Sequence, residues 1–173
     1  EFGAPFVRQD VCKYILQTAA ALDFMNARKH EDLTSCKIGF QHCDVKPGNI
    51  LLFGDRVKLS DFGLVRMVTD DFMPCQYGGT LAYSAPEIFN KQVSQWTDQF
   101  SLAVTYCELR TGKLPFARSP SRFGNGRVQS DPELSALTPE ERSIVTKALH
   151  KQPRNRWPNC LEMAKRLAAL DDR

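Results

Sequence analysis

The sequence lacks the features that mark membrane-spanning, secreted or nucleic-acid-binding proteins. No run of about 18 apolar residues occurs in its 173 residues, so no segment is expected to cross a membrane. The first residues, Glu1-Phe2-Gly3, lack the charge and the apolar core of a signal peptide. A net charge of only +3 gives no indication of nucleic-acid binding. These absences favour a cytoplasmic location, and they leave open a membrane anchor elsewhere in a longer parent protein.

The cysteines show neither a metal-binding pattern nor the spacing of a disulfide framework. The sequence has no Cys-x-x-Cys pair and no histidine at the spacing of a zinc ligand. Nothing in it resembles a small secreted domain held by disulfides. We therefore expect six reduced thiols, at Cys12, Cys36, Cys43, Cys75, Cys107 and Cys160.

Four stretches carry the signals of helices. Apolar side chains recur every three or four residues from Val7 to Met25, which predicts an amphipathic helix. Thr97-Asp98 precedes a stretch from Phe100 to Leu109 that is apolar nearly all round and is ended by Thr111-Gly112, so this helix is expected at the buried centre of the domain. The sequence Thr138-Pro139-Glu140-Glu141 is a capping box that opens a helix through Leu149, and a last helix is predicted for residues 159–170.

A β-hairpin is predicted in the first half of the chain. An apolar run at 50–53 and the alternating stretch Arg56-Val57-Lys58-Leu59 flank the turn residues Gly54-Asp55. Paired strands bring their outer ends together, so Asn49 and Asp61 are expected to be neighbours. By contrast, residues 26–37 are polar and predict a surface loop. This loop is longer than is usual between such a helix and the stretch that begins at His42. Residues 64–87 have few periodic apolar side chains and predict an irregular segment.

The residues around this hairpin suit phosphoryl transfer. That reaction needs a carboxylate to orient the attacking hydroxyl, a cation near the moving phosphoryl group, and hard oxygen ligands for Mg²⁺. Asp44 meets the first need and Lys46 the second. Asn49 and Asp61 offer a neutral and an anionic oxygen for the third.

The motifs, taken together and in this order, resemble the protein kinase signatures. They are His42-x-Asp44-x-Lys46-Pro47-x-Asn49, Asp61-Phe62-Gly63, the run from Gly79-Thr80 to Ala85-Pro86-Glu87, Asp98-x-Phe100-Ser101, and Arg156. The resemblance covers nearly the whole chain. It implies a mainly α (α+β) fold, the large lobe of a kinase, with a buried central helix and a short β-hairpin carrying the catalytic and metal-binding loops. It also implies a catalytic loop at 42–49, an activation segment at 61–87 and a helical subdomain at 88–170.

The resemblance assigns chemical roles residue by residue. It makes Asp44 the catalytic base, with Lys46 and Thr80 beside it. It makes Asn49 and Asp61 the ligands of Mg²⁺, for which Mn²⁺ is an alternative. ATP is the implied cofactor, bound by Lys46, Asn49, Asp61 and Leu51.

Other matched positions are implied to be structural. His42 and Phe62 match packing positions in the kinase spine. Glu87 and Arg156 match a buried ion pair that anchors the end of the activation segment. Asp98 matches the residue that holds the backbone of the catalytic loop.

The sequence departs from the kinase pattern in two places. Cys43 stands where many kinases have an arginine that pairs with a phosphorylated activation segment, although Arg66 lies where a second basic residue often sits. We therefore expect an activity that does not strictly require phosphorylation in residues 61–87. The 41 residues before His42 also leave no room for a small lobe. The chain is thus expected to be a large lobe, inactive without the N-terminal lobe of its parent.

Lys46 and Gly79-Thr80 resemble the serine/threonine branch, and the general texture resembles the bacterial enzymes. The expected partners are ATP and a protein carrying an acceptor serine or threonine. Two alternatives stay open: a pseudokinase that acts as an interaction scaffold, and a small-molecule phosphotransferase. The second alternative is disfavoured by Ala85-Pro86-Glu87, because that class lacks this segment.

Overall fold

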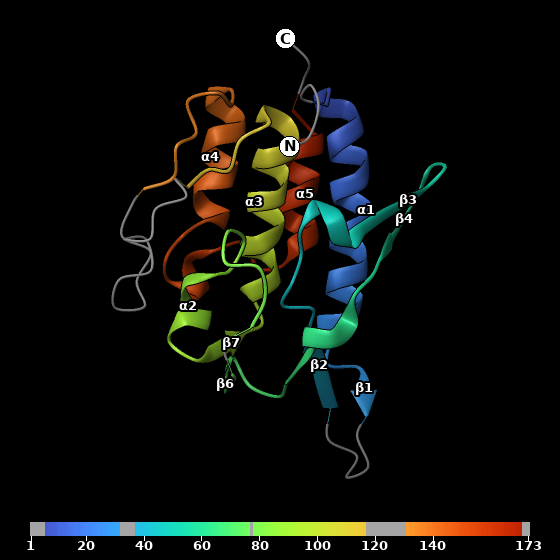
Figure 1. Ribbon diagram of the computed structural model, residues 1–173, viewed down its shortest axis with the longest axis vertical. Coiled ribbons are helices and arrows are strands. Elements are labelled where there is room, and N and C mark those ends of the chain that lie inside the picture. Colours follow the sequence, from blue (N-terminus) through green and yellow to red (C-terminus); the bar gives the residue numbers. More distant parts are fainter. Residues whose placement is uncertain (1–5, 32–36, 77, 117–130, 171–173) are drawn as a thin grey trace.

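The long helices lie side by side and form the body of the molecule (Figure 1). The computed structural model describes residues 6–31, 37–76, 78–116 and 131–170. The helices are α1 (Arg8–Asn26), α3 (Thr97–Thr111), α4 (Pro139–Ala148) and α5 (Cys160–Ala168). Helix α1 packs against both α5 and α3, and α4 packs against α3 and α5. Each predicted helix is present, with ends within two residues of those predicted.

Helix α3 lies at the centre, as its composition predicted. Its apolar side chains are buried, with Phe100, Leu102 and Tyr106 fully enclosed. Its first turn also buries polar residues, among them Asp98 and Gln99. The helix ends at Gly112, whose φ of 70° is left-handed and therefore favours glycine. The central helix is thus a rigid base from which polar side chains can reach neighbouring loops.

The last two helices begin with the capping that their sequences predicted. In α4, Thr138 Oγ1 accepts from the Glu141 backbone N–H at 3.2 Å, and Glu141 Oε2 accepts from the Thr138 N–H at 3.0 Å. The start of α5 is capped by Asn159 and also by Asp23 of α1, which accepts the N–H groups of Cys160 and Leu161. The second cap joins α1 to α5.

The predicted hairpin is present and lies against α1, where Lys13 and Gln17 donate to Asp55 in its turn. Figure 1 shows the two strands beside α1. Strands β3 (Ile50–Phe53) and β4 (Arg56–Leu59) pair antiparallel, with Ile50 opposite Leu59. Gly54 turns the chain with a φ of 57°, a left-handed conformation. The start of β3 and the end of β4 therefore lie side by side next to the helical body.

The loop predicted for residues 26–37 is partly wrong. Strand β1 (His30–Glu31) pairs antiparallel with β2 (Lys37–Gln41), and residues 32–36 lie outside the described residues. Gly39 of β2 lies against the end of α1, where an added Cβ would be only 2.6 Å from the Asn26 carbonyl oxygen. The strands form where β2 lies beside the end of α1 and pairs with β1. The polar composition of the segment does not encode these tertiary contacts.

The irregular segment predicted for residues 64–87 is also partly wrong. Strand β5 (Arg66–Val68) pairs with β2 and completes a three-stranded sheet. Strand β6 (Phe72–Pro74) pairs with β7 (Gln92–Ser94), and a short helix α2 (Pro86–Phe89) begins before the segment ends. Each strand has three residues and a partner far along the chain, so no local periodicity reveals it.

Three single turns of 3₁₀-helix complete the described secondary structure: η1 (Pro47–Asn49), η2 (Phe62–Leu64) and η4 (Pro153–Asn155). Two of them lie at the predicted functional residues. Within the described ranges, no helix is both long and apolar enough to cross a membrane.

Candidate active site

The loop that begins at His42 is held by a carboxylate from the central helix. Asp98, in the first turn of α3, accepts the backbone N–H of His42 at 2.6 Å and that of Cys43 at 2.9 Å. Gln41 completes the connection, because its Oε1 accepts the Asp98 N–H at 3.0 Å. These contacts hold Cys43 in a left-handed conformation with a φ of 64°, which costs a non-glycine residue energy. The first turn of α3 therefore fixes the backbone that precedes Asp44.

Asp44 is the centre of a polar network. One carboxylate oxygen accepts from Lys46 Nζ at 2.7 Å and from Asn49 Nδ2 at 3.0 Å. The other oxygen accepts the Thr80 backbone N–H at 2.9 Å. Lys46 Nζ also donates to Thr80 Oγ1 at 2.7 Å. The structure thus brings together four of the residues that the sequence singled out.

This network favours the ionised form of Asp44. The side chain is 6% exposed, and burial alone raises the pKa of its carboxyl group. The hydrogen bonds from Lys46 and Thr80 and the charge of Lys46 outweigh burial, so the pKa of Asp44 lies below its ordinary value. Asp44 is consequently a carboxylate at neutral pH, able to accept a further hydrogen bond.

Asn49 is oriented by the same loop. Its amide nitrogen donates to the backbone oxygen of Asp44 at 2.8 Å, which directs the amide oxygen away from that contact. Its own backbone oxygen accepts the Ser60 N–H at 3.0 Å, at the end of the hairpin. Asp61 follows Ser60 directly, so the hairpin brings the backbones of these two predicted ligands together.

Asp61 is exposed and has a φ of 63° and a ψ of 70°, in the left-handed region. Among the described residues, none donates a hydrogen bond to its carboxylate. The described part of the chain also holds no cluster of three or more His, Cys, Asp or Glu side chains suited to a metal. One carboxylate and one amide oxygen fit Mg²⁺ or Mn²⁺, hard cations that commonly take their remaining ligands from phosphates and water.

His42 and Phe62 are in contact. Their ring centroids are 5.1 Å apart, and His42 Nε2 lies 3.0 Å from the Ser60 backbone oxygen. His42 is fully buried, whereas Phe62 is 53% exposed. Leu51, on β3, is also exposed, at 42%. Leu51 of the hairpin and Phe62 therefore form apolar surface that another part of the protein can cover.

Glu87 and Arg156 form a buried ion pair with two hydrogen bonds of 2.8 Å. Ser94 and Thr97 also donate to Glu87. Burial raises the pKa of the Glu87 carboxyl group, but the Arg156 guanidinium outweighs burial and holds this pKa below its ordinary value. The pair joins the end of residues 61–87 to the turn before α5, away from the Asp44 network.

Two further residues of the site carried no sequence signal. Ser60 joins the hairpin to the catalytic loop, because its N–H and hydroxyl donate to the Asn49 oxygen and its own oxygen faces His42. Gln41 holds Asp98 through its side chain. Both act through residues distant in the chain, so neither local spacing nor composition could have identified them.

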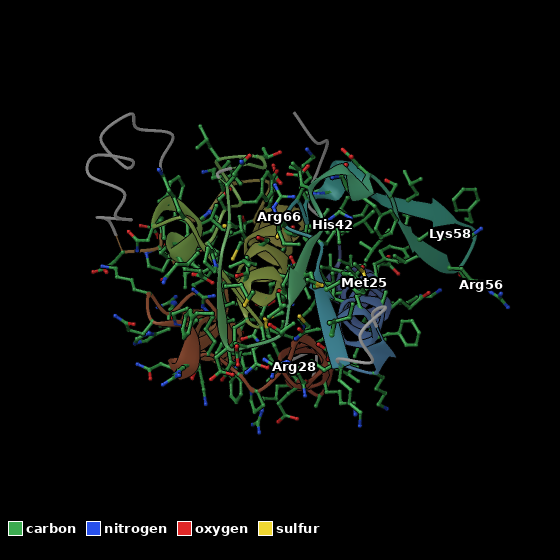
Figure 2. The ribbon with its side chains drawn as sticks, turned by 90° about the horizontal axis from the view of Figure 1, so that it is seen from below. Met25, Arg28, His42, Arg56, Lys58 and Arg66 are labelled. Atoms are coloured by element: carbon green, nitrogen blue, oxygen red, sulfur yellow. The ribbon has the colours of Figure 1, made fainter. Side chains whose placement is uncertain are left out.

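Figure 2 shows His42 beside Arg66, whereas Arg56 and Lys58 point outward from the hairpin. The pairing of β2 with β5 places Gln41 opposite Arg66 and explains this proximity. Arg66 therefore borders the catalytic loop, next to Cys43.

The comparisons with known proteins agree with this arrangement. Residues 3–166 match the family model described as protein kinase domain. Serine/threonine-protein kinase PknF of Mycobacterium tuberculosis is 32% identical over 180 residues, which cover 91% of this chain and 34% of that protein. PknB of Mycolicibacterium smegmatis is 34% identical over 137 residues, covering 72% and 22%. Human ribosomal protein S6 kinase alpha-3 is 31% identical over 170 residues, covering 93% and 22%.

The chain spans about a third or less of the length of these relatives. The family match nevertheless covers most of the chain, and the relatives share one activity in their names. The chain therefore belongs to the protein kinase superfamily, with serine/threonine kinases of the bacterial type among its relatives.

Proposed function

We propose that this chain is the large lobe of a serine/threonine protein kinase, which transfers the γ-phosphoryl group of ATP to a protein serine or threonine. The observation that carries the proposal is the network in which Lys46, Asn49 and Thr80 hold the Asp44 carboxylate. Its residues come from the catalytic loop and from the activation segment. The network therefore needs both segments in one arrangement, which a kinase uses for transfer.

In this proposal Asp44 orients the acceptor hydroxyl. Its carboxylate is ionised at neutral pH and accepts the hydroxyl proton as the oxygen approaches the phosphoryl group. Lys46 holds the carboxylate and supplies positive charge close to the reacting oxygens. Thr80 fixes the far side of Asp44 through its N–H and binds Lys46 through its hydroxyl. All three residues are held by contacts within the chain.

Asn49 and Asp61 would hold Mg²⁺, or Mn²⁺, in this site. A cation held by these two residues would offset the negative charge that develops during transfer. The amide of Asn49 is already oriented by Asp44. The exposed Asp61 would supply the anionic ligand, and the exposed Leu51 would contact the nucleotide.

The nucleotide side of the site requires a second lobe. The residues before His42 that the structure describes form α1 and the β1–β2 pair, and neither element is a glycine-rich phosphate loop or carries its lysine. The open apolar side chains of Phe62 and Leu51 suit a covering lobe. We accordingly propose that residues 1–173 alone bind ATP weakly and transfer phosphate negligibly.

Phosphate transfer from radiolabelled ATP to a serine-containing protein tests the proposal. The chain alone should give a background signal. Preceded by the small lobe of the similar kinase PknF, it should transfer phosphate, and Asp44→Asn in the same chimera should abolish the signal. Glu162→Gln, a change on the exposed side of α5, is the matched control. A folded chimera that binds ATP but transfers nothing would favour the pseudokinase alternative.

A further inference from the structure

Two cysteines from different segments line the same small cavity. Cys43 lies in the catalytic loop, and Cys75 follows strand β6 in the activation segment. Both are free thiols. The cavity is completed by Leu64, Arg66, Gln76, Gly78 and Ile88. Two thiols 32 positions apart in the sequence thus face one space.

The backbone of each cysteine is fixed independently. The Cys43 N–H is held by Asp98 at 2.9 Å. The Cys75 N–H donates to the Lys91 backbone oxygen at 2.9 Å, next to the pairing of β6 with β7. The shared cavity therefore results from anchored backbone on both sides.

The two thiols differ in access and in surroundings. Cys43 is the more enclosed, with its Sγ 3.7 Å from the Gln41 backbone oxygen. Burial raises the pKa of both thiols, and much more for Cys43. The Arg66 guanidinium acts in the opposite direction and favours the thiolate of Cys75. Cys75 is therefore the thiol that an oxidant reaches first.

We propose that Cys43 and Cys75 are a redox-responsive pair, which a peroxide converts into a disulfide joining the catalytic loop to the activation segment. The Cys75 thiolate attacks one peroxide oxygen, and the O–O bond breaks to give a sulfenic acid and, with a proton, water. The Cys43 sulfur then attacks the Cys75 sulfur. Its proton leaves with the hydroxyl group as a second water, so one peroxide oxidises two thiols.

The bond has a defined structural effect. It attaches Cys75 to Cys43, the residue that directly precedes Asp44. It also fills the cavity beside Arg66, which is lined by residues from the first part and from the middle of the segment 61–87. The redox state of this pair would thereby set the mobility of the activation segment. This inference goes beyond phosphoryl transfer and does not depend on the proposed activity.

Peptide mapping after hydrogen peroxide treatment of the folded chain tests the pair. Cleavage after Lys and Arg, except before Pro, places Cys43 in peptide 38–56 and Cys75 in peptide 67–91, with no other cysteine in either. Oxidation followed by alkylation should yield the two peptides joined, lighter by two hydrogens than their sum. Dithiothreitol should separate them completely.

Two variants make the result specific. Cys75→Ser should abolish the joined peptide and leave Cys43 available for alkylation after unfolding. Cys160→Ser removes a cysteine outside the cavity and should leave the joined peptide at its original yield. Arg66→Gln removes one cleavage site, so its Cys75 peptide is 59–91. Its joined product should form severalfold more slowly than in wild type, but should still form. Recovery of both peptides unlinked from folded, peroxide-treated wild type, or linkage of either cysteine chiefly to a third one, would overturn the proposal.

Discussion

The catalytic loop and the Asp61-Phe62-Gly63 stretch differ sharply in how firmly they are held. Each contains a non-glycine residue in the left-handed region, Cys43 with a φ of 64° and Asp61 with a φ of 63°. The Cys43 N–H is fixed by buried Asp98, and the next residue, Asp44, accepts three hydrogen bonds. Asp61 is exposed, and no described residue donates to its carboxylate.

This difference indicates which half of the site the large lobe assembles by itself. Contacts that over-determine a strained backbone hold it in one conformation, whereas an exposed residue with few contacts is free to respond to a ligand. In the proposed site, the acceptor side around Asp44 is held by contacts within the chain. The cation side, at Asp61, would acquire its remaining contacts from a cation and from the small lobe.

The largest expected effect is the difference in stability between two variants, Asp98→Asn and Asp61→Asn. Asp98→Asn replaces one carboxylate oxygen by an N–H₂ group facing buried donors, so it should lower the free energy of unfolding by about 2–3 kcal/mol. Asp61→Asn should change it by less than about 0.5 kcal/mol, because surface changes rarely do more. Urea unfolding monitored by circular dichroism gives both values. Equal losses would remove the distinction between the two regions.

A smaller effect on stability is expected from protonation of the Asp44 carboxylate at low pH. The folded-state pKa is depressed, so ionised Asp44 stabilises the fold above its unfolded pKa, and this contribution is lost as the pH falls through the folded pKa. Asp44→Asn should therefore be less stable than wild type at pH 7 by about 1–2 kcal/mol. The gap should shrink below about pH 4, the ordinary range for aspartate. A constant gap from pH 7 to pH 3 would contradict an ionised, hydrogen-bonded Asp44.

The smallest effect concerns the strained backbone at Asp61. Glycine adopts a φ of 63° without steric cost, which offsets its larger entropy loss on folding. Asp61→Gly should thus leave the free energy of unfolding unchanged or raise it by up to about 1 kcal/mol. Leu64→Gly, in the same turn but without left-handed backbone, is the control and should destabilise. A clear loss in Asp61→Gly would show that its side chain has a structural partner.

Helices and the hairpin could be predicted because their signals are local. The apolar periodicity of residues 7–25, the capping box at Thr138 and the turn at Gly54-Asp55 each lie within one element. Strands β5, β6 and β7 could not, because three-residue strands are defined by distant partners. Asp44 and the three residues around it were identified by chemistry and by resemblance to a family. Ser60 and Gln41 were missed because their contacts are tertiary.

Amide hydrogen exchange of the chain without nucleotide tests most directly whether the acceptor side is preassembled. The amides of His42, Cys43 and Thr80 donate to buried carboxylates and should exchange with the slow-exchanging core. The amides of Phe62 and Gly63 should exchange at least tenfold faster. Protection should be similar in Asp61→Asn and reduced at His42 and Cys43 in Asp98→Asn. Fast exchange at His42, Cys43 and Thr80 in the wild-type chain would contradict the account.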